Sequence, residues 1–136
     1  MIKEPTIINF PKIGNSSLGY ISLAENENLP FEVRRIYWTY FTPEDVERGG
    51  HSHIDLEQIL VAVAGTIIVK TEMPGGIKDT FVLDNPSMGL LIPQFCWREM
   101  KYKNNAVQMC IASIAYDEND YIRDYDVFKK ISNDRS

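Results

Sequence analysis

The chain has 136 residues, of which 44% are apolar and 24% are charged, and its formal net charge is −5. These values are typical of a single globular domain, and the excess of acidic residues leaves no basic surface for nucleic acid. No stretch approaches the ~20 consecutive apolar residues that span a bilayer, and the N-terminus lacks the apolar segment of a signal peptide. We therefore expect one cytoplasmic domain that binds neither nucleic acid nor membrane.

The first third of the chain alternates short apolar segments with polar ones. Residues 6–24 are predicted to form two short strands joined by a turn at 12–17. Residues 31–41 are rich in aromatic and β-branched side chains and are predicted to form a third strand. Because alternate residues of a strand share a face, Arg35 and Tyr37 should lie side by side. This content is unusual for a face that only packs in a core.

The rest of the chain continues as short strands. Residues 64–66 and 101–105 are predicted to be turns that each separate two strands. Only residues 120–130 have the pattern of a short helix or helical tail. Cys96 and Cys110 lie in apolar surroundings without metal-ligand spacing and are predicted to be buried free thiols. Nine or ten strands with regularly spaced turns indicate an all-β sandwich or barrel.

Both histidines of the chain lie close together. His51 and His53 are two residues apart beside apolar, strand-like segments, so a strand would project them to the same side. Gly49 and Gly50 precede them and allow a bend or the close approach of a ligand. Glu57 has the same parity and would point the same way if the strand were unbroken. We predict that this stretch forms the functional site.

The His-x-His pattern in an all-β domain resembles the first motif of the cupin jelly roll. Metal-binding cupins use that motif for two histidines and a glutamate, and a later motif supplies another histidine. Here the later position holds Arg98, whose guanidinium stays charged and cannot ligate a cation. We therefore expect no metal, with a three-ligand site of His51, His53 and Glu57 as the alternative.

Without a metal, the same residues suit acid–base chemistry on an anionic substrate. A histidine has an ordinary pKa near ~6.5 and can both take and return a proton near neutral pH. Arg35, Arg48 and Arg98 are cations that can hold phosphate through paired hydrogen bonds. Tyr37 offers a phenolic donor, and Tyr37 and Trp97 can stack on a base or sugar. The alternative for these side chains is surface ion pairing or core packing.

Four segments together resemble the dTDP-4-keto-6-deoxyglucose 3,4-ketoisomerases, over about residues 30–128. These segments are 48–53, 56–60, 97–100 and 117–126. The resemblance implies a double-stranded β-helix jelly roll, the cupin fold, with a short C-terminal helical tail. It also implies an isomerase of bacterial surface-sugar biosynthesis, such as O-antigen or S-layer glycans, that needs no metal or other cofactor. A homodimer with exchanged N-terminal strands, acting on a dTDP-linked 4-keto-6-deoxyhexose, is expected.

The resemblance further implies that a carbonyl moves from C4 to C3 through an enediol. Two histidines match two proton movements: His51 is assigned as the carbon base and His53 as the oxygen-side shuttle, although the order of these roles stays open. Tyr37 is the candidate donor near the sugar oxygens. Tyr121 and Arg123 either contact the nucleotide or fix the tail. The full set of expected substrate- and nucleotide-binding residues is Arg35, Arg48, Gln58, Trp97, Arg98, Tyr121 and Arg123.

Two positions depart from the pattern or vary within it. Relatives often carry Lys where this chain has Ile54, so a nucleotide contact is lost or replaced here. The residue at Arg98 is Arg in some relatives and His in others, which bears on the face of C4 that is reprotonated. The alternatives are a 3,5-epimerase on the same nucleotide sugar, a metal-dependent dioxygenase of the cupin fold, and a non-catalytic nucleotide-sugar-binding cupin.

Overall fold

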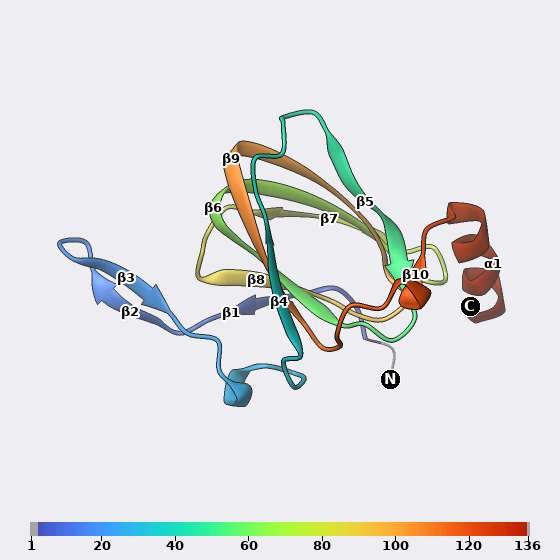
Figure 1. Ribbon diagram of the computed structural model, residues 1–136, viewed down its shortest axis with the longest axis horizontal. Helices are drawn as coiled ribbons and strands as arrows, with labels where there is room; N and C mark the ends of the chain where they lie inside the picture. Colours follow the sequence, from blue (N-terminus) through green and yellow to red (C-terminus); the bar gives the residue numbers. More distant parts are fainter. Residues whose placement is uncertain (1–2, 136) are drawn as a thin grey trace.

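The computed structural model describes residues 3–135 and contains one main antiparallel sheet, one hairpin and one helix. Its elements are β1 (Thr6–Asn9), β2 (Lys12–Asn15), β3 (Gly19–Ser22), β4 (Arg35–Thr39), β5 (Glu47–His53), β6 (Gln58–Glu72), β7 (Lys78–Leu83), β8 (Met88–Ile92), β9 (Trp97–Ala112), β10 (Tyr121–Ile122) and α1 (Tyr125–Arg135). The sheet has the order β1-β8-β6-β9-β5-β10, with β4 also on β9 and β7 also on β6. The strands wrap around a common interior (Figure 1), which confirms the predicted all-β class with a short C-terminal helix.

Two predicted turns are wrong, because β6 and β9 run straight through them. The β6–β9 register shifts on either side of Ala64, where Gly65 has a φ of 70°. On β9, Asn104 and Asn105 also have positive φ values, of 59° and 54°. Gly and Asn tolerate this conformation, so the residues form β-bulges that bend the long strands while pairing continues.

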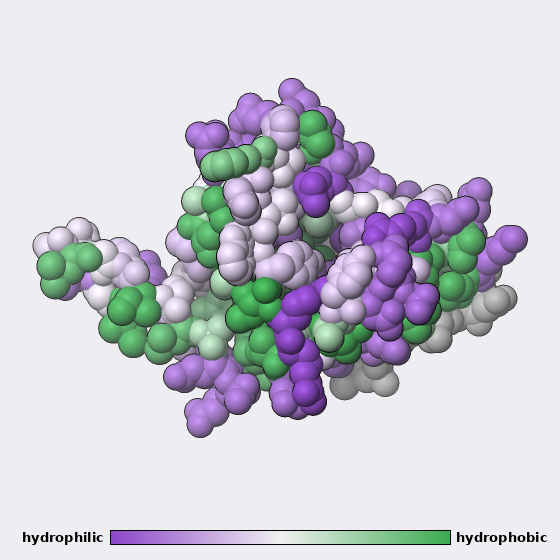
Figure 2. All heavy atoms as spheres, in the orientation of Figure 1, coloured by the Kyte–Doolittle hydropathy of each residue, from purple (hydrophilic) through white to green (hydrophobic). Residues whose placement is uncertain are grey.

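The β2–β3 hairpin stands away from the main sheet and is called the arm here (Figure 1). The predicted turn at 12–17 is therefore wrong over β2, which is a strand. The arm exposes several large apolar side chains, and they are prominent at its end of the molecule (Figure 2). These are Ile13, Leu18, Tyr20 and Ile21. β1, in contrast, pairs with β8 of the same chain.

The C-terminal segment does more than form a helix. Tyr121 and Ile122 add to β5 as strand β10, which the helical pattern at 120–130 did not predict. The helix follows, and Phe128 packs, fully buried, against Trp97 and Ile122. No helix in the described part of the chain is long and apolar enough to cross a bilayer.

The barrel interior is apolar along most of β6, β7 and β8 but polar where β4, β5, β9 and the start of β6 face one another. Leu60, Ile67, Leu83 and Leu90 represent the apolar part and are fully buried. The polar part contains Gln58, Tyr102, Arg98 and Gln108, which are at most 2% exposed. Buried polar side chains are costly unless they are hydrogen-bonded, so this end of the barrel is the candidate for a functional site.

Candidate active site

The histidine pair lies at the end of β5. A register shift between Gly49 and His51 marks a bulge, and Gly49 and Gly50 have φ values of 85° and 69°. The rings of His51 and His53 lie edge to face with their centroids 4.9 Å apart, so both point to the same side, as the spacing predicts. Across the sheet, His51 is paired with Arg98 on β9, and β10 places Tyr121 opposite His53.

A cavity of about 460 Å³ opens beside this pair. It lies between β4, β5, the inner face of β9 and the segment after it. Seven of the ten site residues predicted from the sequence line it: Arg35, Tyr37, Arg48, His51, Gln58, Tyr121 and Arg123. The alternation predicted for residues 31–41 is confirmed, because Arg35, Tyr37 and Thr39 of β4 face the cavity while Ile36 and Trp38 are exposed outside.

Both histidines are neutral at physiological pH. Burial, followed by the positive charge of Arg98, lowers the pKa of His51 to about 3. The same two causes lower the pKa of His53 to about 2. His53 is 2% exposed, is covered by Tyr121 and His51, and places its Nδ1 3.0 Å from a carboxylate oxygen of Asp120. Burial and the nearby Arg98 guanidinium outweigh this carboxylate, so His53 is a neutral imidazole.

Arg98 is a buried cation beneath the cavity. Its Nε donates to the carbonyl of Cys96 at 3.0 Å, and its Nη1 donates to the side-chain oxygen of Gln58. The amide nitrogen of Gln58 donates to Tyr37 Oη at 3.0 Å and to Cys110 Sγ at 2.8 Å. In the described part of the chain no carboxylate pairs with Arg98, and its Nη2 is buried without a partner. Burial raises the pKa of Tyr37, so it remains a phenol that can donate a proton.

The cations that line the cavity differ in how their charge is balanced. Arg123 donates two hydrogen bonds to Glu118, at 2.8 and 3.1 Å, and its guanidinium lies 4.0 Å from the centroid of Tyr121. Arg35 lies over the rings of Tyr37 and Tyr116, and neither it nor Arg48 has an ion pair with any described carboxylate. Arg35 and Arg48 are therefore available for an anionic ligand.

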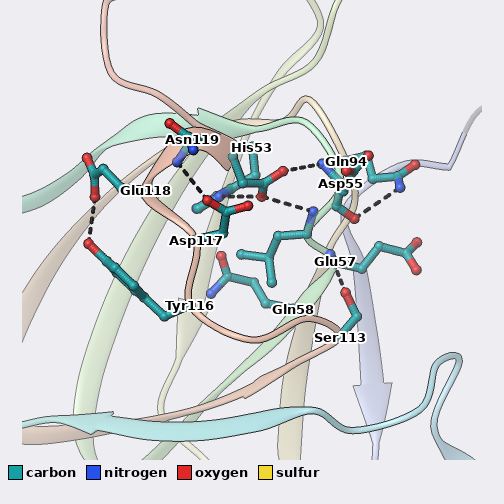
Figure 3. A network of polar contacts seen from close by, with 12 residues as sticks. His53, Asp55, Glu57, Gln58, Gln94, Ser113, Tyr116, Asp117, Glu118 and Asn119 are labelled. Carbon is teal, nitrogen blue, oxygen red and sulfur yellow. Dashed lines mark hydrogen bonds and ion pairs between the residues drawn. The ribbon is translucent and has the colours of Figure 1, made fainter.

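Glu57 does not lie beside the histidines, so the prediction that it points to the same side as they do is wrong. β5 ends at His53, and the chain turns before β6 begins. The backbone N–H of Glu57 donates to Ser113 at 2.8 Å, and its carboxylate points away from His53 (Figure 3) to pair with Lys3 at 2.6 Å. The alternative three-ligand metal set is therefore not assembled, and residues 3–135 hold no other group of three potential ligands.

Two other predicted residues lie away from the cavity surface. Arg98 is below it, and Trp97 is 7% exposed under α1, where it packs against Tyr125 and Phe128. Cys96 and Cys110 are buried free thiols, as predicted.

Two residues near the histidines received no role from the sequence. Asp120 contacts His53, and Tyr116 lines the cavity while its hydroxyl donates to Glu118 at 2.6 Å (Figure 3). Asp120 lies in segment 117–126, which is one of the four segments that carry the family resemblance. What the sequence could not supply was the pairing of β10 with β5, which brings Asp120 beside His53 from 67 positions away.

A neutral histidine, a phenolic donor and unpaired guanidinium groups in one cavity can move protons on a bound anion. Together with the curled antiparallel sheet, they define a cupin-like acid–base enzyme. The family model described as "FdtA: WxcM-like, C-terminal" matches residues 3–133. The chain belongs to this family of sugar 3,4-ketoisomerases, and the match extends beyond the 30–128 expected from the motifs.

Individual relatives agree with this assignment. A TDP-4-oxo-6-deoxy-alpha-D-glucose-3,4-oxoisomerase of Aneurinibacillus thermoaerophilus is 41% identical over 128 residues, which cover 93% of this chain and 91% of the relative. A 3,4-ketoisomerase from Helicobacter canadensis is 36% identical, with a TM-score of 0.89 over 96% of this chain and 98% of the other. The sugar 3,4-ketoisomerase QdtA from Thermoanaerobacterium thermosaccharolyticum, solved with TDP, is 32% identical, with a TM-score of 0.92 over 99% and 98%. A 4-keto-6-deoxy sugar epimerase from Streptomyces spheroides, at 12% identity, shares the fold alone.

Proposed function

We propose that this protein is a 3,4-ketoisomerase that converts TDP-4-keto-6-deoxyglucose into a TDP-3-keto-6-deoxyhexose. The observation that carries the proposal is the neutral His51 at the wall of a cavity that also presents Tyr37 and two arginines without carboxylate partners. The oxoisomerase at 41% identity supports the same reaction. The reaction exchanges protons and involves no net oxidation, so the residues present suffice without a cofactor.

The chemistry follows from the acidity of the C3 proton, which lies next to the C4 ketone. His51 removes this proton, and the electron pair forms an enediolate whose charge develops on O4. Tyr37 donates a proton to O4, neutral His53 takes the O3 proton as the C3 carbonyl forms, and return of that proton from the His53 imidazolium to Tyr37 restores the site. His51 then returns its proton to C4. One proton leaves C3, one reaches C4, and one moves from O3 to O4, so atoms and electrons balance.

The cations supply binding and charge stabilisation. Arg35 and Arg48 are proposed to hold the diphosphate, since both line the cavity and lack a carboxylate partner. Arg98 is fixed below the cavity and is proposed to stabilise the enediolate through its field. Tyr121 and Arg123 are proposed to bound the nucleotide side, and Gln58 to hold Tyr37 in place.

Trp97 was also expected to bind substrate, and its place under α1 supports instead a role in fixing the strand that carries Arg98. The direct-contact role stays a prediction. The C4 configuration of the product is proposed to depend on Arg98. Product NMR after Arg98→His tests this idea, and an unchanged configuration would remove it.

We also propose that two copies form a homodimer through the arm. The arm exposes apolar side chains, and the outer face of β4 exposes Ile36 and Trp38, at 53% and 63%. β1 is paired within its own chain, so the arm is the better candidate for exchange than residues 6–10. Light scattering should give twice the chain mass for the wild type and one chain mass for Trp38→Glu; a monomeric wild type would contradict the dimer.

The direct test is incubation with TDP-4-keto-6-deoxyglucose, followed by NMR of the sugar ring. We expect a 3-keto product with wild type and none with His51→Asn, which should still bind TDP in calorimetry. A 4-keto product inverted at C5 would indicate the epimerase. Binding without conversion would indicate a nucleotide-sugar-binding module.

We place the reaction in the cytoplasm, before an aminotransferase that forms a 3-amino-3,6-dideoxy sugar for surface glycans.

A further inference from the structure

Asp120 is placed to control the second histidine. It ends the 3-10 turn Glu118–Asp120 just before β10 and is 6% exposed. One carboxylate oxygen accepts the backbone N–H of Asp55 at 2.7 Å. The other oxygen accepts the backbone N–H of Leu56 at 3.2 Å and lies 3.0 Å from Nδ1 of His53. Both oxygens are thus held in place by groups other than His53.

These backbone contacts determine which way the His53 bond runs. A backbone N–H can only donate, so the Asp120 oxygens act as acceptors toward the turn after β5. An acceptor carboxylate beside Nδ1 requires a proton on Nδ1, because a neutral imidazole carries one donor and one acceptor nitrogen. The lone pair of His53 is then on Nε2.

The rest of the His53 environment is fixed as well. The backbone N–H of Ile54 donates to the carbonyl of Asp120 at 3.0 Å, and the N–H of Phe95 donates to the carbonyl of His53 at 2.7 Å. The His53 ring lies 4.3 Å, centroid to centroid, from Tyr121. The backbone that carries His53 is therefore held on both sides, and its buried ring is enclosed by Tyr121 and His51.

We propose that Asp120 is a positioning residue that holds His53 in the Nδ1–H tautomer, so that Nε2 is the nitrogen that exchanges a proton during the ketoisomerase reaction. This inference rests on the proposed function for its catalytic part only. The carboxylate also opposes the positive charge of Arg98 when His53 takes up a proton, so the imidazolium formed in the shuttle step is stabilised where it is needed.

The tautomer can be read directly in the resting protein. The chain has two histidines, so His51→Asn leaves His53 as the only imidazole. Nitrogen-15 NMR of this variant without ligand should show a protonated Nδ1 and an unprotonated Nε2 at neutral pH. The opposite tautomer would overturn the proposal, whether or not the protein is an isomerase. This measurement does not depend on how an Asp120 variant folds.

The catalytic part is tested by Asp120→Asn. The asparagine oxygen can keep the bond from Asp55, and its NH₂ group then faces His53 and favours the Nε2–H tautomer. We expect kcat to fall by about a hundredfold or more, with little change in the Kd for TDP. The matched control is Asp117→Asn, in the same turn, whose carboxylate accepts from Asn119 at 3.0 Å and does not contact His53.

Failure of the proposed function and failure of the positioning role of Asp120 give different results. If wild type does not convert the sugar, the proposed function fails while the tautomer result stands. If wild type converts it and Asp120→Asn shows the reversed tautomer with unchanged kcat, the positioning role is wrong. If Asp117→Asn lowers kcat as much as Asp120→Asn, the effect belongs to the turn and the positioning role is also wrong.

Discussion

Arg98 donates a hydrogen bond to the side-chain oxygen of Gln58 inside the barrel, where the two residues are only 1% and 2% exposed. This bond fixes the orientation of the Gln58 amide, whose nitrogen must face Tyr37 and Cys110. The Tyr37 oxygen therefore accepts from Gln58, which leaves its own proton to be donated. The buried cation on β9 thus orients the phenol of Tyr37 on the neighbouring strand β4 through the amide of Gln58.

Replacing Gln58 with leucine should leave the buried charge of Arg98 without its side-chain acceptor. We expect Gln58→Leu to lower the free energy of unfolding by about 2–3 kcal/mol, since a buried charged donor loses its acceptor. Gln108→Leu is the matched control, because Gln108 is equally buried but accepts only from the neutral hydroxyl of Tyr102. It should cost about 1 kcal/mol. Urea unfolding measures the stability of both variants. Equal losses of stability would contradict the stronger dependence on the bond between Gln58 and the charged Arg98.

The two glycines before the histidines should differ in their tolerance of a side chain. Both have positive φ, so alanine at either costs about 1–2 kcal/mol in backbone strain. A Cβ on Gly49 would also lie 2.8 Å from the carbonyl oxygen of Arg98, whereas one on Gly50 meets no atom within 4 Å. Gly49→Ala should therefore be the less stable variant and should lose more activity, because β5 must shift relative to Arg98. Thermal unfolding and turnover assays check this ranking, which similar losses would refute.

Stability should depend on pH through His51. Its pKa is about 3 in the folded protein against 6.5 ordinarily, so the unfolded chain binds more protons between these values. The loss of folding stability due to His51 is absent above about pH 6.5 and grows as the pH falls toward 3. Between pH 7.5 and 5.0, wild type should lose about 2 kcal/mol more than His51→Asn, at about 1.4 kcal/mol per pH unit. If the unfolding free energies of wild type and His51→Asn changed with pH in parallel, His51 would have the same pKa in the folded and unfolded chains.

Local patterns predicted much of this site because they depend on alternation within one strand. Arg35 and Tyr37 share a face of β4, and His51 and His53 share a face of β5, as their spacing requires. The parity argument failed for Glu57, because the chain turns immediately after His53. Asp120 accepts the N–H groups of that turn, and a contact so distant in sequence leaves no local periodic signal.

The strand boundaries failed for a related reason. Gly65 and Asn104 read as turn residues, and each does adopt a turn-like positive φ. Whether such a residue ends a strand or bends it depends on whether a partner strand continues the ladder. β6 and β9 supply each other with that partner. Trp97 is a comparable case, since an aromatic side chain suits a ligand cavity and a helix-packing site equally well.

The helix α1 should contribute strongly to stability through one residue. Phe128 is fully buried against Trp97, so Phe128→Ala should cost about 3–5 kcal/mol. Val127→Ala, at a neighbouring position that is 45% exposed, should change stability by less than about 0.5 kcal/mol. Chemical denaturation compares them. A small effect of Phe128→Ala would show that the helix is not docked on the barrel.

The most direct test of the account follows solvent deuterium into the sugar ring of TDP-4-keto-6-deoxyglucose. If His51 moves a proton between C3 and C4, deuterium should appear at C4 of the 3-keto product and, through the reverse reaction, at C3 of the remaining 4-keto sugar, and at no other ring carbon. His51→Asn should abolish both while it still binds TDP. If the base returns the proton without exchange, the same spectra should still show the 3-keto product in its unlabelled form. Deuterium at C5, or a 3-keto product formed at the wild-type rate by His51→Asn, would contradict the account.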